Sequence, residues 1–202
     1  LYCIIQKTNL SKINKYNYSL FFMSVTAIIP ARSGSKRLPG KNIKIFKGKP
    51  LIQWSIQSAM ASEEVDEVIV STDSYEIAEI SKNLGAKVPF LRPKNMAIDT
   101  SPTIDLVIHL LDKLDRISDV LLLQPTSPLR TTKDIDSIIA LRRKHNKSSS
   151  VSVCEMNFPN NSLYTLKNND KLSKFTITDK LYKLNGALYL SNRKQLCTQK
   201  TF

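Results

Sequence analysis

SVTAIIPARSGSKRLPGKN, residues 24–42, joins a short apolar run to a loop that is rich in positive charge. The run VTAIIP (25–30) has the length and composition of a buried β-strand. The loop behind it combines four cations with three turn-forming residues: Arg32, Lys36, Arg37, Lys41, Gly34, Pro39 and Gly40. Positive charge gathered at the end of a buried strand indicates that the loop binds an anion.

The rest of the chain alternates between strand-like and helix-like segments. Apolar strand patterns cover 66–71, 118–124 and 148–154, and helical spacing covers 50–62, 73–85, 101–116 and 132–145. Strands separated by helices of this length predict an α/β fold with a mostly parallel sheet and helices on both faces. After residue 155 the runs become short and predict a small antiparallel extension, and 191–196 predicts the start of a last helix.

Three polar loops follow the predicted strands, at 30–42, 71–74 and 124–130. In open parallel sheets, ligands bind beyond the carboxyl ends of the strands, so these loops are expected to meet at one edge. The first loop has neither the Walker A spacing nor a G-x-G-x-x-G fingerprint. Its backbone amides at Ser33–Ser35 can nevertheless cup an oxyanion, which Arg32 and Lys41 would neutralise, and this favours nucleotide phosphate.

The other two loops carry less chemical information. Two prolines restrain QPTSPLR (124–130), which presents Gln124, Thr126, Ser127 and Arg130 to a polyhydroxylated acidic ligand or forms a stiff turn before the helix at 132. In STDS (71–74), Asp73 is interpreted as the N-cap of the following helix, with Glu76 closing a capping box, and receives no catalytic role.

Composition narrows the classes of protein that fit. The 202 residues suit one domain, and the net charge of +13 is dispersed without interleaved aromatics, so nucleic acid is the weaker interpretation. No apolar stretch approaches ~18 residues, so no membrane span is expected. Three scattered cysteines and two histidines predict neither disulfides nor a Cys/His metal site and favour a cytoplasmic protein. Residues 1–22 lack periodicity and are interpreted as a leader outside a domain at 23–202.

Six segments in order, from about Val25 to Tyr189, resemble the acylneuraminate cytidylyltransferase family, the CMP-sialic acid synthetases: AIIPARSGSKRLPGKNI, GKPLI, VIVSTDSYEIAEI, GAKVPFLRP, LLLQPTSPLRTTKDID and LNGALYL. The resemblance implies a nucleotide-diphospho-sugar transferase fold, which is a Rossmann-like three-layer sandwich, and a homodimer. It also implies transfer of CMP from CTP to the anomeric hydroxyl of a nine-carbon 2-keto sugar acid, with Mg²⁺ as cofactor and pyrophosphate released.

The resemblance also assigns candidate residues. It implies contacts to CTP from Arg32, Ser35, Lys41, Asn42, Arg92, Ser101 and Thr103. It implies contacts to the sugar from Gln124, Asn185 and Tyr189. The chemistry of the loops adds Ser33, Gly34 and Lys36 to the nucleotide set and Ser127 and Arg130 to the sugar set. Arg32 and Lys41 are the expected catalytic residues, because they can offset charge that grows on the leaving pyrophosphate.

Two departures from the family pattern leave alternatives open. The stretch KFTITDKLYKLNGA (174–187) has Phe175, Thr176, Thr178 and Asp179 where the family carries Arg-Gln and then Leu-Pro. The family's magnesium-holding aspartates follow the NGA motif, so the metal ligands are expected beyond Phe202. One alternative is therefore a related nucleotidyltransferase for legionaminate, KDO or another sugar acid. The other is a truncated chain that binds nucleotide, or a basic nucleic-acid binder, without this activity.

Overall fold

The structure is a computed structural model that describes residues 2–5, 24–98, 100–156, 164–166, 172–174 and 181–202. The helices are α1 (Leu51–Met60), α2 (Tyr75–Asn83), α3 (Thr103–Lys113), α4 (Thr132–His145) and α5 (Arg193–Gln199), with short 3-10 turns η1 (Lys41–Ile43) and η2 (Lys94–Met96). The strands are β1 (Tyr2–Ile5), β2 (Val25–Pro30), β3 (Ile45–Phe46), β4 (Lys49–Pro50), β5 (Glu67–Ser71), β6 (Asp119–Leu122), β7 (Ser149–Met156), β8 (Tyr164–Leu166), β9 (Leu172–Lys174) and β10 (Leu181–Asn192).

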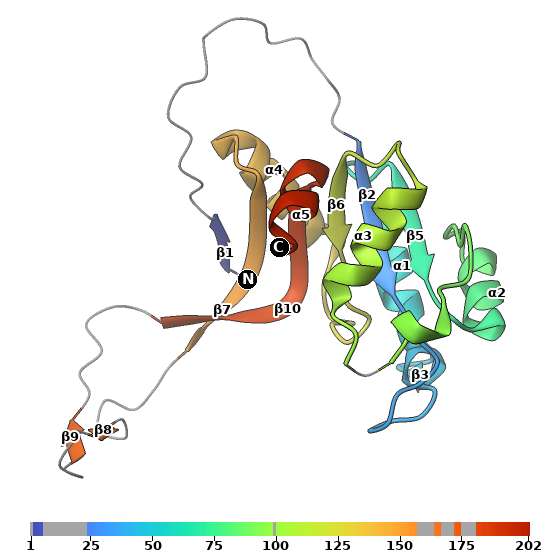
Figure 1. Ribbon diagram of the computed structural model, residues 1–202, viewed down its shortest axis with the longest axis horizontal. Helices are drawn as coiled ribbons and strands as arrows, with labels where there is room; N and C mark the ends of the chain where they lie inside the picture. The colour runs from blue at the N-terminus through green and yellow to red at the C-terminus, as the bar shows by residue number, and fades with distance from the viewer. Residues whose placement is uncertain (1, 6–23, 99, 157–163, 167–171, 175–180) are drawn as a thin grey trace, which may run out of the picture.

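A six-stranded mixed sheet organises the molecule, in the order β1-β7-β10-β6-β2-β5 (Figure 1). Strand β2 pairs in parallel with both β5 and β6. Strand β10 is antiparallel to both β6 and β7, so β2, β5, β6 and β7 run in one direction. The predicted α/β fold with a mostly parallel sheet is therefore confirmed.

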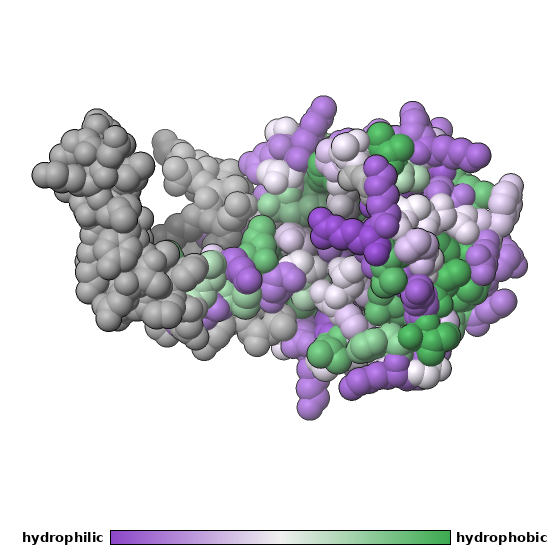
Figure 2. Space-filling model, turned by 90° about the horizontal axis from the view of Figure 1, so that it is seen from below, coloured by the Kyte–Doolittle hydropathy of each residue, from purple (hydrophilic) through white to green (hydrophobic). Residues whose placement is uncertain are grey.

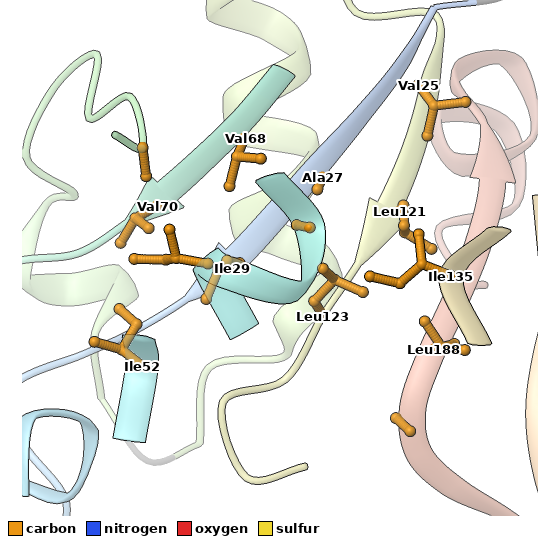
Figure 3. Close-up of a cluster of buried hydrophobic side chains, with 14 of the residues drawn as sticks. Val25, Ala27, Ile29, Ile52, Val68, Val70, Leu121, Leu123, Ile135 and Leu188 are labelled. Carbon is orange, nitrogen blue, oxygen red and sulfur yellow. The ribbon is translucent and has the colours of Figure 1, made fainter. Parts of the chain in front are cut away.

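Helices cover both faces of the sheet because its central strands are apolar on both sides. Ala27 and Ile29 of β2 pack in one core cluster with α1, α2 and α4. Ile28, which points to the opposite face, packs in the second cluster with α3 and α5. Figure 3 shows the first cluster, with Ile52 of α1 and Ile135 of α4 against the sheet. The result is the three-layer sandwich.

Two local predictions differ from the structure. Helix α2 begins at Tyr75, and Ser74 is its N-cap, whose side chain accepts a hydrogen bond from the amide of Ile77. The assignment of Asp73 as N-cap and of Glu76 to a capping box was therefore wrong by one position. The runs after residue 155, expected to be short and to form a small extension, include the 12-residue β10, which belongs to the main sheet. Strands β8 and β9 do form a small antiparallel pair.

Part of the expected leader belongs to the sheet. Tyr2–Ile5 pair antiparallel with β7, with Tyr2 opposite Val153 and Ile5 opposite Ser150. The expectation that all of residues 1–22 lie outside the fold is thus wrong for these four residues. The physical reason is that β7 pairs with β10 on one side only, so that without β1 its other side would present unpaired backbone groups, which can accept another strand. Residues 6–23 lie outside the described residues.

A chain that starts at Met23 tests how much β1 contributes. We expect cooperative unfolding to persist, because both core clusters are built from residues beyond 24. The loss of one short edge strand should lower the melting temperature by about 2–4 °C, equivalent to roughly 1 kcal/mol in a domain of this size. Thermal unfolding followed by circular dichroism measures both quantities. A non-cooperative transition would contradict the expectation.

Candidate active site

The carboxyl ends of β2, β5 and β6 meet at one edge of the sheet. The amide of Ala31, directly after β2, donates to the carbonyl of Ser71 at the end of β5, with an N–O distance of 2.9 Å. The amide of Leu123, directly after β6, donates to the carbonyl of Ile28 at 2.9 Å. The three polar loops that follow these strands therefore start side by side, as the topology predicts.

The loop after β2 (residues 31–42) is closed by a side-chain clamp. Asn42 is buried, and its amide nitrogen donates to the carbonyl of Arg32 at 2.9 Å. Gly40 lies in the left-handed region, with φ of 65°, and directs the chain into the 3-10 turn at Lys41. A side chain at position 40 would strain this conformation, so the glycine fixes where Lys41 begins.

A cleft of about 260 Å³ opens between this loop and the segments after β5 and β6. The seven nucleotide-site positions that the family resemblance implied all line it: Arg32, Ser35, Lys41, Asn42, Arg92, Ser101 and Thr103. Gln124 and Thr126 line it from the loop after β6. Three cations and no carboxylate are found among these described lining residues, so the cleft favours an anion. Figure 2 views this edge from below, where hydrophilic side chains gather beside hydrophobic ones.

Arg92 is a buried cation at this cleft. Its backbone amide donates to the carbonyl of Thr72 at 2.7 Å, and its Nη2 donates to the carbonyl of Ser71 at 3.2 Å. Burial lowers the pKa of Arg92, the carboxylate of Asp73 raises it, and Arg32 lowers it. Among the described residues, its Nε is buried and has no hydrogen-bond acceptor. A cation in the wall of the cleft is suited to an anionic ligand there.

Asp73 is joined to the first loop and was missed as a site residue. One carboxylate oxygen accepts from the amide of Ser33 at 2.8 Å, and the other accepts from its hydroxyl at 2.6 Å. Burial raises the pKa of Asp73, but these hydrogen bonds and the charge of Arg92 together hold it below the usual value. Because the amide of Ser33 is already engaged, it is not an open donor for phosphate, contrary to the expected cup at Ser33–Ser35.

Ser33, Gly34 and Lys36 line a second hollow next to the cleft. This hollow measures about 520 Å³ and shares Arg32, Ser35 and Ile98 with the cleft. Its remaining wall comes from Ala97, Thr100 and Pro39. The cleft is also lined by two apolar residues, Met96 and Ile98, which the sequence pattern did not identify as site residues. They follow a segment without helix or strand periodicity, and only their placement opposite the loop makes them part of the site.

Gln124 lies between the cleft and a bulge in β10. The pairing of β10 shifts register between Leu184 and Tyr189, and Gly186 has φ of 77°. A Cβ at Gly186 would lie 3.6 Å from Oε1 of Gln124, so the bulge brings the backbone of β10 next to this amide. The glycine thus permits both the turn in β10 and its approach to Gln124.

The other expected sugar-binding residues are not among those that line the cleft. Arg130 is buried, and its guanidinium donates to the carbonyl of Ala187 at 2.8 Å and to the hydroxyl of Ser55 at 2.6 Å. Burial lowers the pKa of Arg130 to about 10, so it is still charged at neutral pH. It therefore joins α1, β10 and the Gln124 loop, and its interpretation as an exposed donor to the ligand is corrected.

Three more of the expected sugar-binding residues make contacts within the protein in the same region: Asn185, Tyr189 and Ser127. Oδ1 of Asn185 accepts from the hydroxyl of Ser152 at 2.6 Å and from the amide of Ala187 at 3.0 Å, which stabilises the bulge. Tyr189 packs on Phe202, with ring centroids 5.6 Å apart, and burial raises its pKa. The amide of Ser127 donates to the carbonyl of Gln124 at 3.2 Å within the turn. The expectation that Asn185 and Tyr189 border the cleft is not met in the described residues.

The described residues do not supply a metal site. Nowhere in this part of the chain do three or more His, Cys, Asp or Glu side chains come together around a position for an ion. Asp73, the carboxylate that contacts the loop, directs both oxygens to Ser33. This donor set does not fit a resident divalent cation, which requires several oxygen ligands. The stretch 175–180, which carries the departures from the family pattern, lies outside the described residues.

Comparison with known proteins gives consistent matches. The sequence profile of the family described as cytidylyltransferase matches residues 26–200. The CMP-N,N'-diacetyllegionaminic acid synthase of Legionella pneumophila is 39% identical over 193 residues, covering 89% of this chain and 83% of that protein. The N-acylneuraminate cytidylyltransferase of Escherichia coli is 34% identical over 187 residues, covering 88% of this chain and 44% of that protein. A solved CMP:2-keto-3-deoxy-manno-octonic acid synthetase complexed with CTP has a TM-score of 0.65 at 22% identity, covering 89% of this chain and 79% of its own.

Proposed function

The chain belongs to the cytidylyltransferase family, and from this we propose that it transfers CMP from CTP to the anomeric hydroxyl of a nine-carbon 2-keto sugar acid. The observation that carries the proposal is the cleft beyond β2 and β6, lined by Arg32, Lys41 and Arg92. Its positive charge matches a nucleoside triphosphate, and its place in the fold is where open sheets bind ligands.

In the proposed reaction the anomeric oxygen forms a bond to the α-phosphorus of CTP, and the bond from that phosphorus to the bridging oxygen breaks. Pyrophosphate leaves with the electron pair, and the proton of the hydroxyl passes to the solvent. Arg32 and Lys41 would bind the phosphates and offset the charge that grows on the leaving group. Such transfers depend on positioning and charge neutralisation more than on a covalent nucleophile.

We place the triphosphate beside the loop 31–42 and the sugar acid toward Gln124. The side chain of Gln124 lines the cleft at the bulge of β10, where an amide can donate to or accept from a hydroxyl. Arg130 and Asn185 would act on the sugar site indirectly. Their hydrogen bonds to Ala187 stabilise the bulge in β10 that lies next to Gln124. This division leaves Arg32 and Lys41 with the phosphates and Gln124 with the sugar.

The second candidate within this class is a legionaminate-type sugar acid as acceptor. The relative from Legionella pneumophila, at 39% identity, is named for that sugar, whereas the relative named for N-acylneuraminate is 34% identical. The two sugars share the reacting 2-keto acid end, so the same cleft chemistry serves either one. The choice of acceptor rests on residues around the rest of the sugar.

A pyrophosphate-release assay with four nucleoside triphosphates and several sugar acids tests the proposal. We expect release with CTP and a nine-carbon acceptor, and little with KDO or with the other three triphosphates. CTP binding without turnover for any acceptor would favour the nucleotide-binding alternative. Binding to DNA that weakens with salt, without affinity for CTP, would favour the nucleic-acid alternative.

Mg²⁺, a homodimer and a cytoplasmic location, which the family resemblance implies, complete the proposal. When bound with CTP, Mg²⁺ would supply additional neutralisation of phosphate charge. Cys154 and Cys197 are free thiols, in keeping with a reducing compartment. In the part of the chain that the structure describes, no helix has the length and apolarity that a membrane crossing requires. Sedimentation analysis tests the dimer.

A further inference from the structure

The segment 71–74 forms a fixed platform beside the loop 31–42. The carbonyl of Ser71 accepts from the amide of Ala31, and the carbonyl of Thr72 accepts from the amide of Arg92. The hydroxyl of Thr72 also accepts from the amide of Ser74 at 3.1 Å. Hydrogen bonds from the amides of Ala31 and Arg92 thus fix the backbone of this short connection between β5 and α2. The position from which the side chain of Asp73 projects is therefore fixed as well.

Asp73 is not the N-cap of the helix that follows it. Ser74 is the N-cap of α2 and receives the hydrogen bond from Ile77. The carboxylate of Asp73 is instead directed across the edge of the sheet to Ser33, 40 positions earlier in the chain. Both of its oxygens are used there, one by the amide and one by the hydroxyl of the same residue. Two charge-assisted hydrogen bonds to one residue fix both its backbone and its side chain.

The loop 31–42 has a side-chain clamp near each of its two ends. Asn42 holds the end of the loop by donating to the carbonyl of Arg32, and Asp73 holds its start at Ser33. Residues 36–39 are exposed. A loop of this kind loses conformational freedom when it binds phosphate, and clamps that order it beforehand reduce that loss.

We propose that Asp73 is a positioning residue that holds the phosphate-binding loop in the conformation that presents Arg32 and Ser35 to the cleft. Arg32 directly precedes Ser33 and its carbonyl accepts from Asn42, and Ser35 follows Ser33 by two residues, so both depend on where Ser33 is held. Asp73 would act through Ser33 rather than by contact with the substrate. The proposal rests on the proposed function only in taking CTP as the ligand.

Three variants separate this role from a general effect on stability. Asp73→Ala removes both hydrogen bonds and should weaken CTP binding roughly tenfold or more. Asp73→Asn can accept from the amide of Ser33 and donate to its hydroxyl, so affinity should stay within about threefold of the parent. Ser74→Ala is the matched control, because it removes the cap of α2 at the next position and should lower the melting temperature without weakening CTP binding.

Calorimetry with CTP alone gives the affinities, and steady-state kinetics should show a raised KM for CTP with little change in the KM for the sugar acid. Hydrogen exchange of the peptide spanning residues 31–38, measured without any ligand, should accelerate in Asp73→Ala and not in Ser74→Ala. If Asp73→Ala does not fold, Ser33→Ala takes its place, because it removes only the hydrogen bond of the hydroxyl. It should weaken CTP binding and accelerate exchange in the loop, both to a smaller extent.

The proposal is overturned if Asp73→Ala binds CTP as tightly as the parent, or if Ser74→Ala weakens CTP binding as much as Asp73→Ala does. The proposed function fails separately. In that case the parent releases no pyrophosphate with any sugar acid, while Asp73→Ala still accelerates exchange in the loop and weakens CTP binding.

Discussion

Lys41→Ala should lower turnover by on the order of 10² or more while leaving the melting temperature nearly unchanged. Lys41 lines the cleft at the start of η1, directly after the left-handed Gly40. Its ammonium group is proposed to offset the charge on the leaving pyrophosphate, so its loss raises the barrier of the chemical step. The side chain is only partly buried, and its removal opens no cavity in either core cluster.

Steady-state pyrophosphate release and thermal unfolding measure the two effects. Lys44→Ala is the matched control, because it removes the same charge three residues further along, from an exposed side chain that does not line the cleft. It should retain nearly full turnover. Lys41→Arg keeps the charge but replaces a compact ammonium with a planar fork, so it should bind CTP and turn over more slowly. Equal turnover of Lys41→Ala and the parent would remove Lys41 from the mechanism.

Asp119→Ala should have the largest effect on stability, a loss of about 3–5 kcal/mol in the free energy of unfolding. Asp119 at the start of β6 forms a two-pronged ion pair with Arg142 of α4, at 2.6 and 2.9 Å. The side chains of Asp119 and Arg142 are 2% and 6% exposed. Removing the carboxylate leaves a buried guanidinium whose charge is no longer compensated.

Denaturant unfolding of single and double variants tests this prediction. In the double variant Asp119→Val with Arg142→Met both charges are gone, and stability should recover much of the loss. Arg116→Ala is the control on the surface. Its partner Glu67 also contacts Lys87, and the Arg116 side chain is 54% exposed, so the cost should be about 0–1 kcal/mol. A loss below 1 kcal/mol for Asp119→Ala would contradict the prediction.

Much of the fold follows from local patterns in the sequence. The run Ala27-Ile28-Ile29 is apolar at every position because β2 is covered on both faces, and that run predicts a central strand. The helical spacing of 132–145 predicts α4 because only one of its faces contacts the sheet. Once strands and helices alternate, the shared edge of the three loops follows from the topology.

The long-range partners of the polar side chains could not be predicted in this way. Asp73 has the composition and position of a helix cap, and the sequence does not show that Ser33 lies across the edge of the sheet. Arg130 looks like an exposed donor in a turn until β10 enters the sheet beside β6 and brings the carbonyl of Ala187, 57 positions later, to its guanidinium.

The sequence by itself determined the α/β class, the order of the elements from β2 to β7 and the basic loop at the end of the first central strand. Each of these depends on which faces of a short segment are apolar, a property that neighbouring residues define. Only the tertiary structure decided that Tyr2–Ile5 extend the sheet, that Asp73 contacts Ser33 and that Arg130 is buried. The Asp73 contact depends on the pairing of β5 with β2, the added strand on its pairing with β7, and the burial of Arg130 on the place of β10 beside β6, because strand pairing sets which distant backbone and side-chain groups lie within hydrogen-bond distance.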